Sequence, residues 1–198
     1  MPARSIHRGA INQLEFLDDG EILSRDTQEI ALQWSTSGDA RPTTREFSSG
    51  VTRLAPAWLP KLRNAIDREI SRQDGGGEVV TVVAQTLAAT LIFGNGVVIF
   101  DLAESPDRPL NQLYVGNAPG SHVLSSARAI ALHPDGRRIA IGSTRSDAPL
   151  QLWDARAGVP LAILEGHEAA VESVAFNVDG TLLASGSADR TVRVWKID

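Results

Sequence analysis

The chain has 198 residues, with 42% hydrophobic side chains and a formal net charge of −5 from 19 basic and 24 acidic residues. This length fits one large domain or two small ones, and it is ample for a buried core. The acidic balance argues against nucleic acid as the main partner, and the absence of cysteine excludes disulfides, thiolate zinc sites and a cysteine nucleophile. No apolar run is long enough to span a bilayer, and the first residues lack a signal-peptide run. We therefore expect a soluble cytoplasmic protein with no membrane partner.

Residues 5–47 predict a small antiparallel sheet. Asp19-Gly20 lies between two short runs rich in apolar residues, which is a strong hairpin signal. A third run ends at Trp34. The expected strands are 11–16, 22–24, 30–34 and the residues near 45–47.

Residues 50–115 predict a second sheet of the same kind, which carries an insertion at 57–78. We expect this unit to start at 51–55. It should end in a hairpin at 91–101, whose turn is Asn95-Gly96.

The insertion predicts one short amphipathic helix. Leu62, Ile66 and Ile70 are spaced four residues apart and would share one helical face. Pro60 suits the first helical turn, and Trp58 comes just before it. We favour docking of this face on the chain's own sheets. The alternative is that Trp58, Leu62, Ile66 and Ile70 bind a partner protein.

The last two units, residues 120–164 and 166–198, repeat a common order of strands and turns. Their Asp-Gly turns are 44 residues apart, and their final tryptophans, Trp153 and Trp195, are 42 residues apart. Four strands per unit at a period of about 40–45 residues is the pattern of a β-propeller blade.

Residues 166–198 resemble a WD40 repeat. The resemblance rests on Gly166-His167, the Asp179-Gly180 turn, the small-residue strand 182–187, Asp189 and Trp195. It implies an all-β fold of about four WD40-like β-propeller blades, each with four antiparallel strands, and one short inserted helix. The propeller would be partial, or completed by oligomerisation.

In the WD40 family, a histidine, a serine or threonine, an aspartate and a tryptophan form one hydrogen-bonded set, here called the structural tetrad. In the last repeat these positions match His167, Asp189 and Trp195, with Ser185 or its same-face neighbour Ser187 as the hydroxyl. The chemistry fits, because an imidazole can donate to a carboxylate and accept from a hydroxyl. Partial tetrads in the first and third repeats match His7, Ser24, Trp34, Asp147 and Trp153.

Serine, histidine and aspartate also make up the triad of hydrolases. The chain has no Gly-x-Ser-x-Gly motif, and the tryptophan completes a structural set instead. The 4 histidines show no metal-binding spacing, and His133 belongs to a His-Pro-Asp-Gly turn. We therefore expect no catalytic residues, no metal site and no cofactor.

The resemblance implies a non-catalytic scaffold that mediates protein–protein or protein–peptide interaction. Two other functions stay open. One is a C-terminal regulatory or sensor segment of a larger signalling protein, and the other is a propeller-type hydrolase or lyase.

Self-association is a further expectation. WD40 propellers commonly close with about seven or eight blades, and this chain supplies about four. Residues 3–6 form a strand that can pair with residues 192–195 of the same chain or of a second copy. Because bare blade faces drive association, we predict that two copies join head to tail into a ring, or that the chain is part of a longer array.

Overall fold

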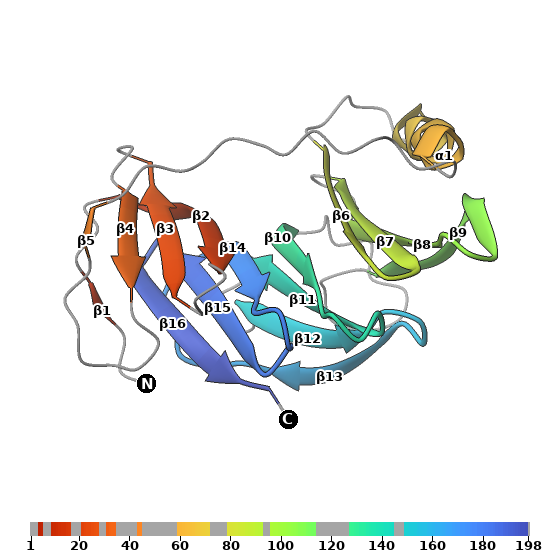
Figure 1. Ribbon diagram of the computed structural model, residues 1–198. Helices are drawn as coiled ribbons and strands as arrows, with labels where there is room; N and C mark the ends of the chain where they lie inside the picture. Colours follow the sequence, from red (N-terminus) through yellow and green to blue (C-terminus); the bar gives the residue numbers. More distant parts are fainter. Residues whose placement is uncertain are drawn as a thin grey trace.

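The computed structural model describes residues 4–5, 9–16, 21–27, 31–34, 43–44, 59–71, 79–92, 96–113, 127–144 and 149–197. These residues form four antiparallel sheets of four strands each and one helix (Figure 1). The predicted all-β fold of four-stranded blades with one short helix is confirmed. Among the described residues, no helix is long and apolar enough to cross a membrane.

We number the blades in chain order. Blade 1 consists of β2 (Ile11–Phe16), β3 (Ile22–Asp26), β4 (Ala31–Trp34) and β5 (Thr43–Thr44). Blade 2 consists of β6 (Val79–Ala84), β7 (Leu87–Ile92), β8 (Gly96–Asp101) and β9 (Ser105–Leu113). Blade 3 consists of β10 (Ala127–Leu132), β11 (Arg138–Ser143), β12 (Leu150–Asp154) and β13 (Val159–Ile163). Blade 4 consists of β14 (Val171–Phe176), β15 (Leu182–Ser187), β16 (Thr191–Lys196) and β1 (Arg4–Ser5).

The outer strand of blade 4 comes from the start of the chain. Arg4 pairs with Val192 and Ser5 pairs with Thr191 in antiparallel register. The strand predicted near residues 3–6 therefore completes the last blade of its own chain, and this structure needs no exchange with a second copy. Blade 1 follows β1 directly, so the same pairing seats blade 1 beside blade 4.

The blades lie side by side in the order 2, 3, 4, 1. Inner strand β10 packs on β6 and β7, β14 packs on β10 and β11, and β2 packs on β14 and β15. Figure 1 shows the described strands in an arc that begins with blade 2 and ends with blade 1. We call the side of a blade that meets the next blade in this order its following face, and the opposite side its preceding face.

The centre of each contact between blades is apolar, because alternate residues of the middle strands point to opposite faces. Three clusters of buried side chains fill the contacts. The contact between blades 2 and 3 includes Leu91, Ile99, Ile139 and Ile141. The contact between blades 3 and 4 includes Leu150, Leu152, Val171 and Leu183. The contact between blades 4 and 1 includes Ala184, Val192, Ile11 and Ile22.

The second unit differs from its expected layout. Its four strands all lie between residues 79 and 113, so helix α1 (Leu59–Ser71) precedes the blade instead of interrupting it. The predicted starting strand at 51–55 lies outside the described residues, and the sheet is complete without it. A two-residue turn at Gln85-Thr86 joins β6 to β7, with Gln85 at φ 51°. The sequence gives no Asp-Gly signal there, which is why the turn was not expected.

Candidate functional site

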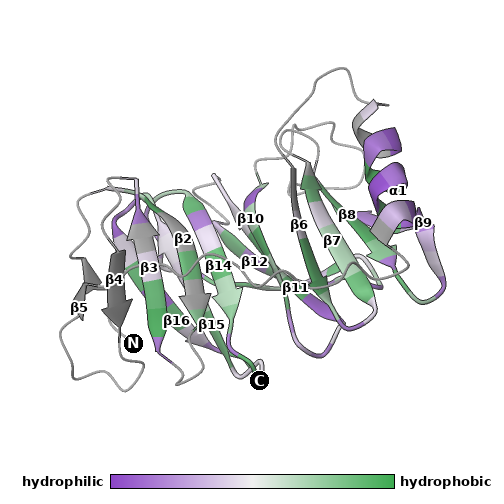
Figure 2. Cartoon of the chain, turned by 45° about the horizontal axis from the view of Figure 1, so that its top comes forward, coloured by the Kyte–Doolittle hydropathy of each residue, from purple (hydrophilic) through white to green (hydrophobic). Residues whose placement is uncertain are grey.

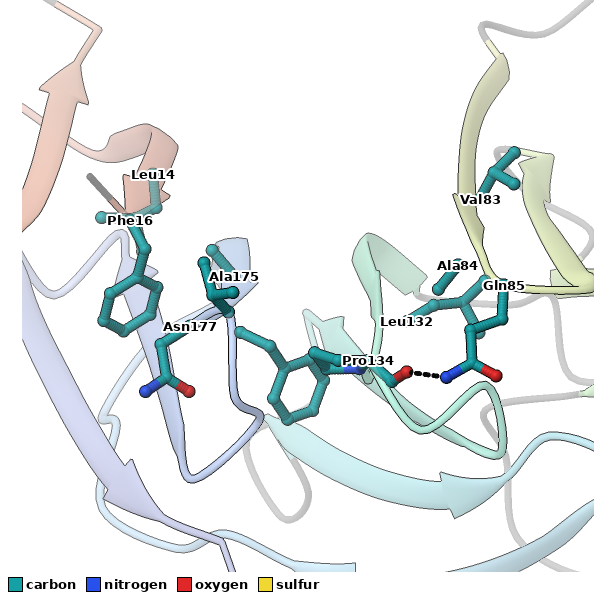
Figure 3. A pocket seen from close by; sticks show the side chains of 11 residues that line it. Leu14, Phe16, Val83, Ala84, Gln85, Leu132, Pro134, Ala175 and Asn177 are labelled. Carbon is teal, nitrogen blue, oxygen red and sulfur yellow. Dashed lines mark hydrogen bonds between the residues drawn. The ribbon is translucent and has the colours of Figure 1, made fainter. Parts of the chain in front are cut away.

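The concave side of the arc holds a pocket of about 560 Å³ to which all four blades contribute. Each wall comes from the end of an inner strand, β2, β6, β10 or β14, or from the turn that follows it (Figure 3). The lining residues are Leu14, Phe16, Val83, Ala84, Gln85, Leu132, Pro134, Ala175, Phe176, Asn177 and Val178. Ligand pockets of proteins are typically about 300–1,000 Å³, and this pocket falls within that range.

The pocket is apolar and carries no charge among its described lining residues. Val83 is 46% exposed and Val178 is 82% exposed, although both are aliphatic. Figure 3 places Phe16 on one side and Val83 on the other, with Pro134 between them. Exposed apolar side chains that gather in a concave surface are typical of a binding site.

Contacts between neighbouring turns hold the pocket floor. The side-chain amide of Gln85 donates from Nε2 to the carbonyl oxygen of Pro134 at 2.5 Å, which ties blade 2 to blade 3 (Figure 3). Nε2 of His133 lies 2.9 Å from the carbonyl oxygen of Gly180, which ties blade 3 to blade 4. The turn residue of one blade thus reaches over the turn of the next.

These contacts explain the glycines of the two Asp-Gly turns. Gly136 and Gly180 have φ of +65° and +76°, a region that favours glycine. A Cβ on Gly136 would lie 3.2 Å from Cβ of Gln85, and a Cβ on Gly180 would lie 2.2 Å from Nε2 of His133. Both backbone conformation and close approach therefore select glycine.

The side chain of His133 connects its own turn to the turn of the next blade. Its side chain is buried, and Nδ1 accepts the backbone N–H of Asp135 at 3.0 Å. Nε2 lies 2.9 Å from the carbonyl oxygen of Gly180 and 3.0 Å from Nη2 of Arg138. The ring also meets the edge of Phe176 with centroids 4.9 Å apart. Both ring nitrogens are occupied, as a turn residue requires.

The structure brings together the four side chains that the sequence matched to a tetrad in the last repeat. Nδ1 of His167 lies 2.7 Å from Oδ2 of Asp189, and Nε2 lies 2.8 Å from Oγ of Ser185. The indole Nε1 of Trp195 donates to the same Oγ at 2.8 Å. The tetrad serine in this structure is therefore Ser185.

The protons of the tetrad can be assigned from its donors and acceptors. Trp195 donates to Ser185, so the Ser185 hydroxyl donates to Nε2 of His167, and Nδ1–H of His167 donates to Asp189. This order needs a neutral imidazole. Burial lowers the pKa of His167 by more than the hydrogen bond to Asp189 raises it, which keeps the ring neutral near pH 7.

Asp189 also orders the turn between β15 and β16. Although burial raises its pKa, hydrogen bonds from Thr191, His167 and the backbone N–H of Glu168 together lower the pKa below its usual value. Ser187 lies beside this group and donates to the carbonyl oxygen of Ala169 at 3.2 Å. Ser187 is thus a turn anchor next to the tetrad.

Ser185, His167 and Asp189 have the connectivity of a hydrolase triad, but their surroundings do not suit catalysis. Ser185 is 0% exposed, and its oxygen already accepts the indole N–H of Trp195. A nucleophile needs a free lone pair aimed at a substrate. The arrangement joins strands β15 and β16 to the segment before β14 and to the β15–β16 turn, which is a structural role.

The partial tetrads are only partly visible. The indole of Trp153 donates to Oε1 of Gln151 at 3.0 Å, so a neighbour on its own strand satisfies it. Ser24 is fully buried in blade 1. The remaining positions, His7, Asp147 and the side chain of Trp34, lie outside the described residues.

The predicted partner-binding helix face requires a correction. Leu62 is 1% exposed and Ile66 is partly buried, because both pack on blade 2 of their own chain. The docked arrangement, which we favoured, is the one found, and these two side chains are not available to a partner. Trp58 and the side chain of Ile70 lie outside the described residues.

Sequence reasoning did not find the pocket. No sequence motif identifies Phe16 or Val83 as pocket residues. They lie near the ends of two separate strands, 67 residues apart in the chain. The position of these residues within each repeat could have predicted the pocket. Each inner strand of a repeat ends at the same level, so the residues just before each first turn should converge.

Comparison with known proteins agrees with this architecture. Residues 158–196 match the family model described as WD domain, G-beta repeat. The chain is 46% identical over 68 residues to the periodic tryptophan protein 2 homolog of Schizosaccharomyces pombe, which is 34% of this chain and 8% of that protein. It is 32% identical over 99 residues to the ribosome biogenesis protein WDR12 homolog of Brugia malayi, which is 44% of this chain and 23% of that protein.

Among solved structures, the chain is similar to the computationally designed Ika4 protein. The TM-score is 0.47 with 18% sequence identity, over 97% of this chain and 94% of that chain.

The four-stranded sheets are blades of the β-propeller kind, and residues 158–196 carry a WD repeat. The matched WD repeat runs from β13 of blade 3 through β16 of blade 4. It spans 8% of the length of the first curated relative named above.

Proposed function

We propose that the chain is a non-catalytic scaffold that binds a protein or peptide partner in the concave pocket. The observation that carries this proposal is the composition of the pocket wall. Four blades line a pocket with a volume of about 560 Å³. Its wall is mostly apolar, carries no charged side chain among its described residues and is partly exposed. Such a surface suits the apolar side chains of a peptide better than a charged metabolite or a phosphate group.

The polar groups at the rim support a peptide as the ligand. Asn177 lines the pocket and donates from Nδ2 to the hydroxyl of Thr181 at 3.2 Å. Its Oδ1 accepts the backbone N–H of Leu182 at 2.8 Å, so the side chain is held in place. Fixed amides beside an apolar surface can pair with the backbone of a bound peptide and give it orientation.

Catalysis in the pocket lacks support from its residues. The described lining residues include no carboxylate, histidine, cysteine or lysine, and no group of metal-ligating side chains occurs in the described parts of the chain. General acid–base or nucleophilic chemistry needs such groups within reach of a substrate. A binding role needs only the complementary shape and apolar area that are present.

A selected peptide tests the proposal. Peptides are selected from a displayed random library on the full chain, and their affinities are measured by fluorescence anisotropy. Val83→Asp and Val178→Asp each place a carboxylate on an exposed pocket position, so they should fold normally and weaken binding about tenfold or more, which is about 1.4 kcal/mol.

Leu161→Asp provides the matched control. Leu161 is 50% exposed, lies on outer strand β13 and does not line the pocket. Binding should stay within about twofold of the parent. Peptides that bind equally well to both pocket variants would show that the concave surface is not the binding site.

A further inference from the structure

The outer strand of blade 3 is exposed and apolar. Strand β13 has the sequence Val-Pro-Leu-Ala-Ile, and every one of its residues is exposed. The aliphatic side chains of Val159, Leu161 and Ile163 are 47%, 50% and 51% exposed. No charged or polar side chain interrupts this strand. Exposed apolar strands at the edge of a sheet are places where another strand can pair.

The outer strands of the other three described sheets differ from β13. Strands β1 and β5 have 2 residues each, Arg-Ser and Thr-Thr. Strand β9 includes Asp107 and Arg108. Figure 2 colours most of β9 between white and purple, on the hydrophilic side of the scale. Short length and charged side chains protect a sheet edge from pairing, and β13 has neither protection.

Hydrogen bonds show which backbone groups of β13 face outward. The N–H of Leu164 donates to the carbonyl oxygen of Leu150 at 2.9 Å. Ala162 pairs with Leu152. Because these two residues direct their backbone groups inward to β12, Ile163 between them directs its N–H and C=O to the open edge. Strand β13 comes last in the strand order of its sheet, so no described strand pairs with these groups (Figure 1).

The first part of the edge is blocked, which limits where a strand can add. Pro160 has no N–H, and the register shifts beside it, so two residues of β13 oppose Trp153 there. The open part runs from Leu161 through Ile163 to Glu165. Alternation puts these three side chains on the same face as Trp153, which is the preceding face of blade 3.

The chemistry of the open part favours an extended peptide segment as its occupant. Outward backbone groups are matched by the backbone of another strand, and Leu161 and Ile163 suit aliphatic side chains on that strand. Glu165 is exposed and takes part in none of the ion pairs of the described residues. A lysine or arginine opposite Glu165 would therefore be stabilised.

A second copy of β13 is a poorer match. Antiparallel pairing of two copies, centred on Ile163, would bring Glu165 of each copy against Leu161 of the other. A carboxylate placed against an aliphatic side chain loses hydration without gaining a partner. The occupant that fits is thus a different sequence.

We propose that β13 is a docking site for an extended segment of a partner protein, which adds to blade 3 as a further strand. Antiparallel addition continues the pairing within that blade. The segment carries a lysine or arginine followed by two aliphatic residues at alternate positions, which lie opposite Glu165, Ile163 and Leu161 in that order. This inference is independent of what the concave pocket binds.

A synthetic peptide tests the proposal with the full chain. The probe is Thr-Lys-Thr-Val-Thr-Val-Thr, acetylated and amidated at its ends, added to about 1 mM to the isotope-labelled chain while amide NMR signals are followed. The amide signal of Ile163 should shift and saturate. The amide signal of Val83, which lines the concave pocket, should stay in place.

Two altered peptides test the backbone pairing and the charge. N-methylation of the first valine removes the N–H that would donate to the carbonyl oxygen of Ile163, and it should weaken binding about tenfold. Glutamate in place of lysine should weaken binding about two- to fivefold. Glu165→Gln should remove this preference for lysine.

Leu161→Asp tests the side-chain contact. It should weaken the strand peptide about tenfold or more, and it should leave a peptide of the concave pocket within about twofold. Val178→Asp is the matched control, because its side chain is 82% exposed and lines the pocket. It should leave the strand peptide within about twofold. Leu161→Asn replaces the aspartate variant if circular dichroism shows unfolding.

Three results would overturn the proposal: no saturable shift at Ile163, equal binding of the N-methylated peptide, or equal binding by Leu161→Asp. Light scattering on the parent adds a fourth check. A mass of two chains that Leu161→Asp returns to one would show that a second copy, and not a partner segment, occupies β13.

Discussion

The indole N–H of Trp195 donates to the hydroxyl oxygen of Ser185 at 2.8 Å, and this contact connects the third strand of blade 4 to its second. The same oxygen serves His167, which in turn bonds to Asp189 in the next turn. One buried hydroxyl thereby links residues from both ends of the last repeat. Removing any member takes one hydrogen-bond partner from its neighbours in the protein interior.

We predict that Ser185→Ala lowers the free energy of unfolding by about 1–3 kcal/mol, because it leaves the indole N–H of Trp195 and Nε2 of His167 unpaired in a buried site. His167→Ala should cost a similar amount, since Asp189 and Ser185 lose their shared partner. Urea denaturation followed by circular dichroism measures both.

Ser71→Ala serves as the control for these variants. Ser71 is exposed at the end of α1 and bonds only locally, to the carbonyl oxygen of Asp67 at 2.7 Å. Its removal should change stability by less than about 0.5 kcal/mol. Parent-like unfolding of both Ser185→Ala and His167→Ala would show that the tetrad contributes nothing to stability.

The free energy of unfolding should also fall as the pH drops below about 6.5, which is the ordinary pKa of a histidine side chain. Burial lowers the pKa of His167 in the folded chain, so the unfolded chain binds more protons between the two pKa values. The stabilisation is complete above the unfolded pKa and is lost as pH falls toward the lowered folded pKa.

The histidine variant isolates this effect. His167→Gln keeps a donor and an acceptor in the tetrad but does not titrate. Urea midpoints at pH 7.5 and pH 5.5 should therefore differ less for His167→Gln than for the parent. An equal pH dependence in both proteins would assign the titration to other groups.

The fold could be predicted from the sequence because propeller repeats are locally encoded. The Asp-Gly turn at Gly180, the final Trp195 and the strand between them recur at a fixed period, and each turn specifies its own hairpin. The spacing of Leu62 and Ile66 likewise predicts helix α1. These features depend on residues close together in the chain.

The pocket and the packing of α1 on blade 2 could not be predicted in the same way. Phe16 and Val83 meet at one concave surface only because four separate strands end at the same level of the arc. Likewise, nothing local indicates that Leu62 docks on Phe100 and not on a partner. Both depend on how whole blades are placed, which periodicity does not give.

Gly180→Ala should destabilise the chain by more than about 1–2 kcal/mol, the usual cost of a left-handed conformation for a residue with a side chain. The φ of +76° carries that cost, and the new Cβ would also lie 2.2 Å from Nε2 of His133. Thermal unfolding of the single variant measures the sum.

Adding His133→Ala separates the two causes. The double variant removes the clash but keeps the unfavourable φ, so Gly180→Ala should cost less in the His133→Ala background than in the parent. Equal costs in both backgrounds would mean that His133 does not press on this turn.

A last prediction concerns the ion pair that joins blades 2 and 3. Nη1 of Arg156 donates to Oδ2 of Asp101 at 2.7 Å, and Nη2 donates to the hydroxyl of Thr86 at 3.1 Å. Asp101 also accepts the backbone N–H groups of Ala103 and Glu104 through Oδ1, at 3.0 and 3.2 Å. The carboxylate therefore serves both the contact between the blades and its own turn.

The two partners should consequently differ in cost. Arg156 is 43% exposed, so Arg156→Ala should lower stability by about 0–1 kcal/mol and matter less at high salt. Asp101→Ala should cost more, about 1–3 kcal/mol, since it also leaves two turn N–H groups without their acceptor. Urea denaturation of both variants at about 0.05 and 0.5 M salt provides the comparison. If Arg156→Ala proves the more damaging of the two, the ion pair between the blades, and not the turn, is the main role of Asp101.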